Sequence, residues 1–198
     1  MTTQVTGSGV NFNGSTSGTI LLTQPAVAGT NTITLPAETG TLRSTVSSGT
    51  VLQVVNYQTG AVATGTTTIP ADNSIPQNTE GDQYMSLAIT PRSATSTLII
   101  SVVWSGGNTA AASAVSAALF QDSTANALAI MWSQHSPGYP AFVGFSHKMT
   151  SGTTSSTTFK VRGGCNVAGT TSFNGVNSGT GYYGGVLASS ITITEVVP

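Results

Sequence analysis

Short stretches in which apolar and polar residues alternate recur through most of the chain, and this period of two constrains the fold more than any other feature. In residues 85–90, Met85, Leu87 and Ile89 alternate with smaller or polar residues. The pattern returns at 98–104, 128–132, 143–145, 159–161 and 191–193. Side chains on a β-strand point alternately to its two faces, so each stretch predicts a strand with one buried face. Short strands joined by turn residues, without an amphipathic helix pattern, predict an all-β fold containing a β-sandwich of jelly-roll-like architecture.

One Ala-rich segment, residues 110–120, breaks this alternation. Its intrinsic propensity alone favours a helix. The residues that follow it, Gln-Asp-Ser-Thr-Ala-Asn at 121–126, are typical of a hairpin turn that leads into another strand. We therefore predict a strand over 110–120.

A low content of charge distinguishes this chain from an ordinary globular domain. Only 6% of its residues are charged, against roughly a quarter in a typical domain. Thr, Ser, Asn and Gly take their place; Thr fits a pleated, half-buried surface and Gly fits the turns. Because a charge-poor surface in water is prone to associate, we expect much of this surface to meet other copies of the chain.

Charge and hydropathy also argue against several classes of protein. A net charge of −1 gives no basic surface for nucleic acid, and no apolar run is long enough to cross a bilayer. The single cysteine, Cys165, excludes an intrachain disulfide and is expected to be a buried, inert thiol. The first residues lack the basic and apolar regions of a signal peptide, so we expect synthesis and assembly in a cytoplasm.

The first part of the chain is expected to form an extended β-arm. Its two short apolar runs, each closed by a proline, contain Ile20 with Leu22 and Ile33 with Leu35. Two such ribbons cannot bury an apolar face alone, so they need a partner, either the rest of the chain or symmetry mates. A polar stretch at 43–50 marks a boundary. The sequence thus predicts an arm over residues 1–43 and a β-sandwich head over residues 51–198.

Several segments resemble known virion proteins. GSTSGT at 14–19, PAVAGT at 25–30 and TLPAETGTL at 34–42 resemble a module of bacteriophage tail-fibre and collar proteins. The body is similar to the small β-sandwich domains that end or decorate phage fibres, in VLQVV at 51–55, ITP at 89–91, STLII at 96–100, LFQDS at 119–123 and SITITEV at 190–196. The resemblance implies a homotrimer, an arm that docks on the virion and a head that faces outward.

This resemblance leads to three hypotheses about function. The first is a non-enzymatic structural protein of the virion: a short trimeric fibre on the tail or the head, assembled in the host cytoplasm. Its arm would bind other virion proteins, and its head would bind a glycan or protein of the host surface. The second is a capsid decoration protein that stabilises the particle. The third, which the short chain disfavours, is a carbohydrate-active enzyme of the tailspike kind.

Few residues in the sequence have the chemistry of a catalytic or metal site. The only acidic cluster holds Asp72, Glu80 and Asp82 at a spacing unlike an EF-hand, which favours a solvated loop over a cation site. His147 alternates with apolar residues and is expected to be structural. We therefore predict no catalytic residues, no metal and no cofactor.

Aromatic residues in predicted loops are the best candidates for recognition of a host surface. Rings with a polar tip suit wet binding surfaces and can lie against the face of a sugar. The alternative is that the same rings fill the core or the trimer interface. The candidate receptor-binding residues, which include one loop histidine, are Trp132, His135, Tyr139, Phe142, Tyr182 and Tyr183.

Overall fold

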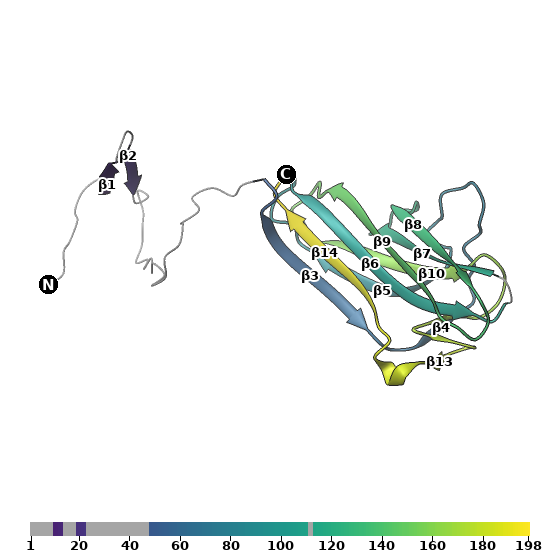
Figure 1. Ribbon diagram of the computed structural model, residues 1–198. Helices are drawn as coiled ribbons and strands as arrows, with labels where there is room; N and C mark the ends of the chain where they lie inside the picture. The colour runs from purple at the N-terminus through teal and green to yellow at the C-terminus, as the bar shows by residue number, and fades with distance from the viewer. Residues whose placement is uncertain (1–9, 14–18, 23–47, 111–112) are drawn as a thin grey trace. The chain divides into compact units, whose positions relative to one another are not determined.

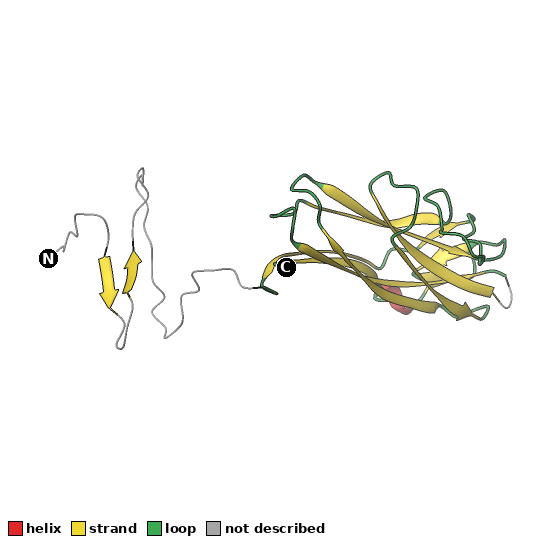
Figure 2. Ribbon diagram, turned by 90° about the horizontal axis from the view of Figure 1, so that it is seen from above, coloured by secondary structure: helices red, strands yellow, loops and turns green. Residues whose placement is uncertain are grey.

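The computed structural model describes residues 10–13, 19–22, 48–110 and 113–198 (Figure 1). The chain divides into two units, Met1–Ser44 and Thr45–Pro198. Strands dominate the described residues, as the yellow arrows of Figure 2 show, and their one helical segment is the short 3-10 turn η1 (Tyr183–Gly185). None of the described helical structure has the length and hydropathy needed to cross a membrane.

The first unit contains one described hairpin. Its strands β1 (Val10–Asn13) and β2 (Thr19–Leu22) pair antiparallel, so that two of the four predicted docking residues, Ile20 and Leu22, lie on β2. The other two, Ile33 and Leu35, lie outside the described residues. The extent of the arm and its docking role stay predictions.

The second unit, which we call the head, is a sandwich of two antiparallel sheets. The first sheet contains, side by side, β3 (Val51–Thr59), β14 (Ser189–Val196), β6 (Thr97–Asn108) and β9 (Ala141–Thr150). It is extended by β11 (Thr171–Phe173) and β4 (Ala63–Gly65), which continue beyond the end of β14. The second sheet contains β5 (Asp82–Ile89), β10 (Thr157–Cys165), β7 (Ser113–Gln121) and β8 (Ala129–His135). A separate small ribbon pairs β12 (Gly175–Val176) with β13 (Thr180–Gly181).

The order of these strands is that of a jelly roll. Taken along the chain, the eight long strands alternate between the sheets except for the hairpin β7–β8, and they pair as β3-β14-β6-β9 and β5-β10-β7-β8. Two interlocked Greek keys give this order. The predicted all-β fold with a jelly-roll-like sandwich is therefore confirmed.

The core lies between the two sheets and is built by the alternation that the sequence shows. On β6, Leu98, Ile100 and Trp104 are fully buried, whereas Ile99 and Val103 on the opposite face are exposed. The inner face of the second sheet meets them with residues such as Phe159, Val161 and Leu119. Burial of large apolar side chains at every second position is what fixes the register of each strand.

Residues 113–120 of the Ala-rich segment form β7, which confirms the predicted strand over the described part of that segment. The strand lacks alternation because both of its faces are covered. Its inner face joins the core through Val115 and Leu119, and its outer face packs Ala118 and Phe120 beneath Ile69 of a crossing loop.

The long strand β6 gives the head two distinct ends. At its start, Thr97 pairs with Val196, and the next residue of the chain, Val197, accepts a backbone hydrogen bond from Gly49 at 2.9 Å. At the other extremity, Gly106 pairs with Ala141, the residue after the β8–β9 loop. At roughly 3.3 Å per residue, β6 extends about 35 Å from Thr97 to Asn108 and separates these ends. We call the end where the chain enters the near end, and the opposite one the far end.

Candidate functional site

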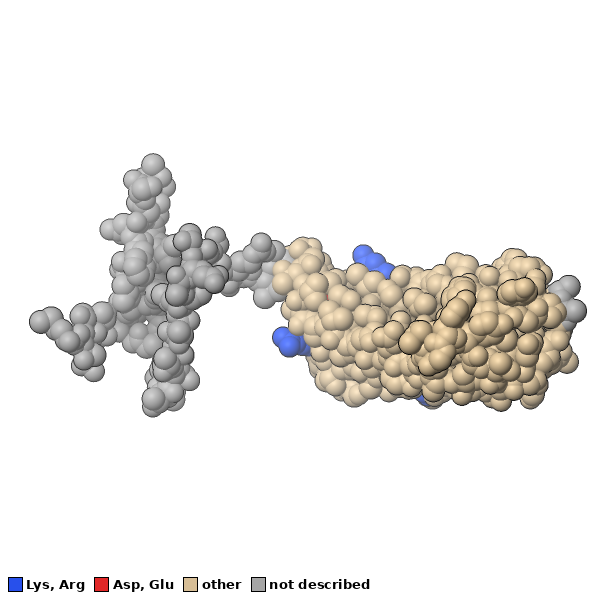
Figure 3. Space-filling view, turned by 60° about the horizontal axis from the view of Figure 1, so that its bottom comes forward, with Lys and Arg blue, Asp and Glu red and all other residues tan. Residues whose placement is uncertain are grey.

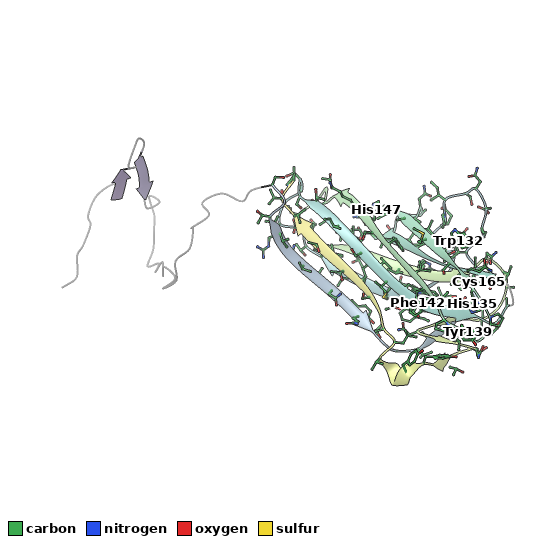
Figure 4. All side chains as sticks on the ribbon, viewed as in Figure 1. Trp132, His135, Tyr139, Phe142, His147 and Cys165 are labelled. Carbon is green, nitrogen blue, oxygen red and sulfur yellow. The ribbon has the colours of Figure 1, made fainter. Side chains whose placement is uncertain are left out.

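The predicted receptor-binding residues gather toward the far end of the head. Figure 4 places Trp132, His135, Tyr139 and Phe142 there, away from the C-terminus. Four of the six are well exposed: Trp132 at 62%, Tyr139 at 70%, Phe142 at 60% and Tyr183 at 74%. They do not form one site, because Trp132 lies on the outer face of the second sheet, whereas Phe142 pairs with Ser105 on the first.

Two loops at the far end are tied together by a tyrosine. The hydroxyl of Tyr182 donates a hydrogen bond of 2.7 Å to the carbonyl oxygen of Gly138, in the loop that carries Tyr139. The rings of Tyr182 and Tyr183 lie 5.8 Å apart. We call Tyr139, Tyr182 and Tyr183 the tyrosine surface.

The backbone at Tyr183 is held in an uncommon conformation. Its φ of 51° lies in the left-handed region, as do those of Gly184 and Gly185 that follow. For a residue with a Cβ this conformation costs about 1–3 kcal/mol and is enriched at functional positions. The turn directs the Tyr183 ring into solvent, where it can contact a partner.

The structure corrects the prediction for His135. This residue is the last of β8 and is only 1% exposed, so it is not part of a receptor-binding surface. Its Nε2 atom accepts a hydrogen bond of 3.1 Å from the backbone N–H of Asn108, and it thereby braces the end of β6. Burial lowers the pKa of His135, and the backbone carbonyl of Tyr139 opposes this without making a hydrogen bond of good geometry to Nδ1. The Pro-Gly sequence that predicted a loop begins just after the histidine.

Two other expectations concern polar residues near the core. His147 is half-buried on β9 opposite Ile100, on the inward-facing side shared with Phe145 and Met149, as predicted for a structural histidine. Cys165 is a free thiol, and it is buried as expected.

The three acidic residues of the predicted loop serve separate turns. Asp72 accepts hydrogen bonds from the backbone N–H and hydroxyl of Ser74, Glu80 from the backbone N–H of Gln77, and Asp82 from Thr67. Within the described part of the chain, no three His, Cys, Asp or Glu side chains are placed to share a metal ion. The carboxylates therefore stabilise loop structure individually.

A groove on the outer face of the second sheet was not predicted from the sequence. It has a volume of about 550 Å³, within the usual range for small-molecule sites, and lies between the loop at 70–76 and the strands β7 and β8. Trp132 and Ile130 line it from β8, and Asp72 lines it from the loop. The loop and β8 are far apart in sequence, so no local pattern reveals the groove. The alternation at 128–132 predicted a buried face for Ile130 and Trp132, whereas both side chains are exposed on the outer face of β8.

Comparison with known proteins gives only remote likenesses. No protein-family model matches the chain, and no curated protein matches it. Latent PorU from Porphyromonas gingivalis is 7% identical over 80% of this chain, with a TM-score of 0.39; the chain spans 14% of PorU. VP2 of infectious bursal disease virus, in a subviral particle, is 13% identical over 91% of this chain with a TM-score of 0.33, and 47% of that protein is covered. In the T13 particle of this virus, the matching protein is 12% identical over 91% of this chain with a TM-score of 0.35, and 42% of that protein is covered. At these scores the likenesses assign no function.

Proposed function

We propose that this chain is a non-enzymatic structural protein of a virus particle: a short homotrimeric fibre that binds the host surface through the far end of its head. The observation that carries the proposal is that the chain entry and the exposed tyrosine rings lie at opposite ends of the head. The chain enters it at Gly49, and the exposed rings of Tyr139 and Tyr183 lie on loops at the opposite end. A stiff sandwich about 35 Å long would hold these rings away from whatever the preceding residues bind.

The resemblance of the arm to phage fibre modules supports attachment to other virion proteins. In this proposal residues 1–43 dock the fibre on the tail or the capsid, after assembly in the host cytoplasm. Low charge, 6% of all residues, favours contact between copies of the chain. Three heads together would raise avidity without requiring a strong single site.

The trimer is the first testable part of the proposal. Sedimentation equilibrium of the full chain at micromolar concentration is expected to give three times the chain mass of 19.9 kDa. The physical reason is that the short apolar strands of the arm cannot bury a face alone, and symmetry mates would supply the partners they need. A stable monomer would contradict both the fibre and a trimeric decoration protein.

Attachment is tested by removing one exposed ring. Tyr183→Ala is expected to weaken adsorption of the purified protein to host cells by about tenfold or more, because an exposed tyrosine at the centre of a contact is a typical hot spot. Adsorption is measured by flow cytometry with labelled protein, and circular dichroism confirms the fold.

The control for this experiment is Val54→Ala, which removes an exposed apolar side chain from β3 of the first sheet, outside the tyrosine surface. It is expected to leave adsorption unchanged. Tyr182→Phe, which loses only the hydrogen bond to Gly138, separates the effect of loop support from that of ring contact. Equal adsorption by Tyr183→Ala and the parent protein would refute attachment through this end.

A decoration protein is the second candidate, and the outer face of the first sheet favours it. Lys148 is the only charged side chain that β3, β14, β6 and β9 direct outward. Ile99, which pairs with Lys148, and Val103, further along β6, are exposed on the same face. Figure 3 shows a face of the head on which Lys and Arg side chains are few and isolated. Such a face suits broad contact with neighbouring subunits. Particles that lack the protein, adsorb normally and burst on heating would favour this candidate over the fibre.

A further inference from the structure

We infer that the groove between the 70–76 loop and β8 binds a neutral saccharide, with the Trp132 indole as its stacking platform. The inference goes beyond the proposed function, because it assigns a ligand to a surface separate from the tyrosine surface. It would hold equally for a fibre and for a decoration protein.

The groove is shaped before any ligand arrives. Its loop wall is anchored by Ile69, which packs with Phe120 and Ala118 on the outer face of β7. Further along the loop, the carbonyl oxygen of Pro76 accepts a backbone hydrogen bond of 2.9 Å from Ala127. A wall anchored on both sides of the groove loses little conformational freedom on binding, which favours affinity for a small ligand.

Trp132 supplies an open ring face. It lies on β8, opposite Ser116, at an outward position of the second sheet. The neighbouring outward residues of β7, Ser116 and Ala114, are small and leave the floor of the groove open. The faces of an aromatic ring carry negative charge density. A pyranose ring presents a face of weakly positive C–H groups, so it fits the indole as a stacked layer.

Polar groups around the ring match the hydroxyls of a sugar. The Asn166 Oδ1 atom accepts a hydrogen bond of 2.9 Å from the backbone N–H of Ala114, so the Nδ2 donor is directed away from that bond. The Gln134 amide, on β8 beside Trp132, offers both a donor and an acceptor. Each sugar hydroxyl both donates and accepts a hydrogen bond. Amide side chains, which offer donors and acceptors, can therefore orient the hydroxyl and offset the cost of its desolvation.

The charge of the groove selects against acidic ligands. Asp72 is the one ionisable side chain among the lining residues, and the hydroxyl and the N–H of Ser74 hold the pKa of its carboxyl below the usual value. Ser74 hydrogen-bonds to its Oδ1 atom, so Oδ2 is the oxygen left for ligand hydroxyls. A sialylated or phosphorylated sugar would meet a like charge and no cation. A neutral sugar suffers no such repulsion.

Two tryptophans make the inference directly measurable. Trp104 is fully buried and Trp132 is exposed, so acrylamide quenches mainly the fluorescence of Trp132. The full chain is first screened on an array of neutral, sialylated and phosphorylated oligosaccharides. Neutral binders are then tested for protection of Trp132 from acrylamide. We expect millimolar or tighter binding of a neutral oligosaccharide, with loss of the quenchable fraction at saturation.

Variants then test the site. Trp132→Ala is expected to weaken binding by about tenfold or more, Trp132→Phe by less, and Asp72→Asn to improve tolerance of acidic sugars. The control is Val54→Ala, which removes an exposed apolar side chain from β3 of the first sheet and should leave affinity unchanged. The inference is overturned if no oligosaccharide on the array binds or if only acidic oligosaccharides bind. It is also overturned if neutral oligosaccharides bind Trp132→Ala as tightly as the parent protein. A monomer that binds no cells yet binds sugar through Trp132 would refute the proposed function alone.

Discussion

Replacing Glu195 with alanine is expected to lower the free energy of unfolding of the head by about 3–5 kcal/mol. Glu195 is fully buried on the inner face of β14, where it follows Ile191 and Ile193 in the alternation. Its carboxylate accepts hydrogen bonds from the backbone N–H groups of Arg92 and Ser93, at 2.8 and 3.3 Å. The side chains of Gln53 and Ser96 donate two more. Each buried donor that loses its acceptor costs about 1–3 kcal/mol.

The same carboxylate predicts a loss of stability in acid. Burial by itself raises the pKa of Glu195, but hydrogen bonds from Ser96, Gln53 and the backbone at Arg92 and Ser93 outweigh it and hold this pKa below its ordinary value of 4.5. Because the folded pKa is the lower one, the contribution is fully present above about pH 4.5 and is lost as the pH falls toward the folded pKa.

Urea unfolding followed by circular dichroism, at one protein concentration and a series of pH values, measures both effects. Glu195→Gln keeps the shape of the side chain but removes its charge. It is therefore expected to lower the free energy of unfolding less than Glu195→Ala does, and to reduce the loss of stability below about pH 4.5. Thr194→Ala, on the outer face of the same strand, is the control and should change the free energy by no more than about 0.5 kcal/mol. The same loss of stability in acid in Glu195→Gln as in the parent protein would contradict the claim that protonation of Glu195 causes it.

The alternation of residues was sufficient to predict the fold class. The stretches 98–104 and 191–193 form strands whose apolar side faces the core. The stretch 128–132 also forms a strand, but its Ile130 and Trp132 point to the outer face, so the buried face predicted there was wrong. The same pattern also holds the position of Glu195, since a residue two places after Ile193 must point inward. An acidic residue at an inward position indicates a buried carboxylate that accepts several hydrogen bonds, and the position of Glu195 can be read from the sequence.

The exposure of the candidate binding residues was only partly predictable. Exposed rings such as Tyr139 and Tyr183 were found because they lie beside Gly and Pro in local turns. His135 was misplaced because the strand continues to the last residue before the turn. The groove at Trp132 depends on a loop more than fifty residues earlier that covers β7, and contacts of this range leave no local pattern.

Gly106→Ala is expected to destabilise the head by about 3 kcal/mol, through close approach rather than unusual backbone conformation. A Cβ at this position would lie 2.3 Å from the carbonyl oxygen of Ser172 and 2.5 Å from the indole of Trp104. The first atom belongs to the backbone of β11, which pairs with β6 at this point, and the second to a ring enclosed by the core. Neither can move without disturbing a sheet or the packing around Trp104.

Gly144→Ala makes the same chemical change on the neighbouring strand and serves as the matched control. Apart from its two chain neighbours, the nearest atom to its Cβ would be the carbonyl oxygen of Val102 at 3.8 Å, which is an ordinary contact. Alanine there restricts the unfolded chain, so stability is expected to stay constant or to rise by about 0.4–1 kcal/mol. Urea midpoints read from the fluorescence of the buried Trp104 in a Trp132→Phe background compare the two variants. Equal midpoints would mean that β6 and β11 do not approach as closely at Gly106 as the jelly roll requires.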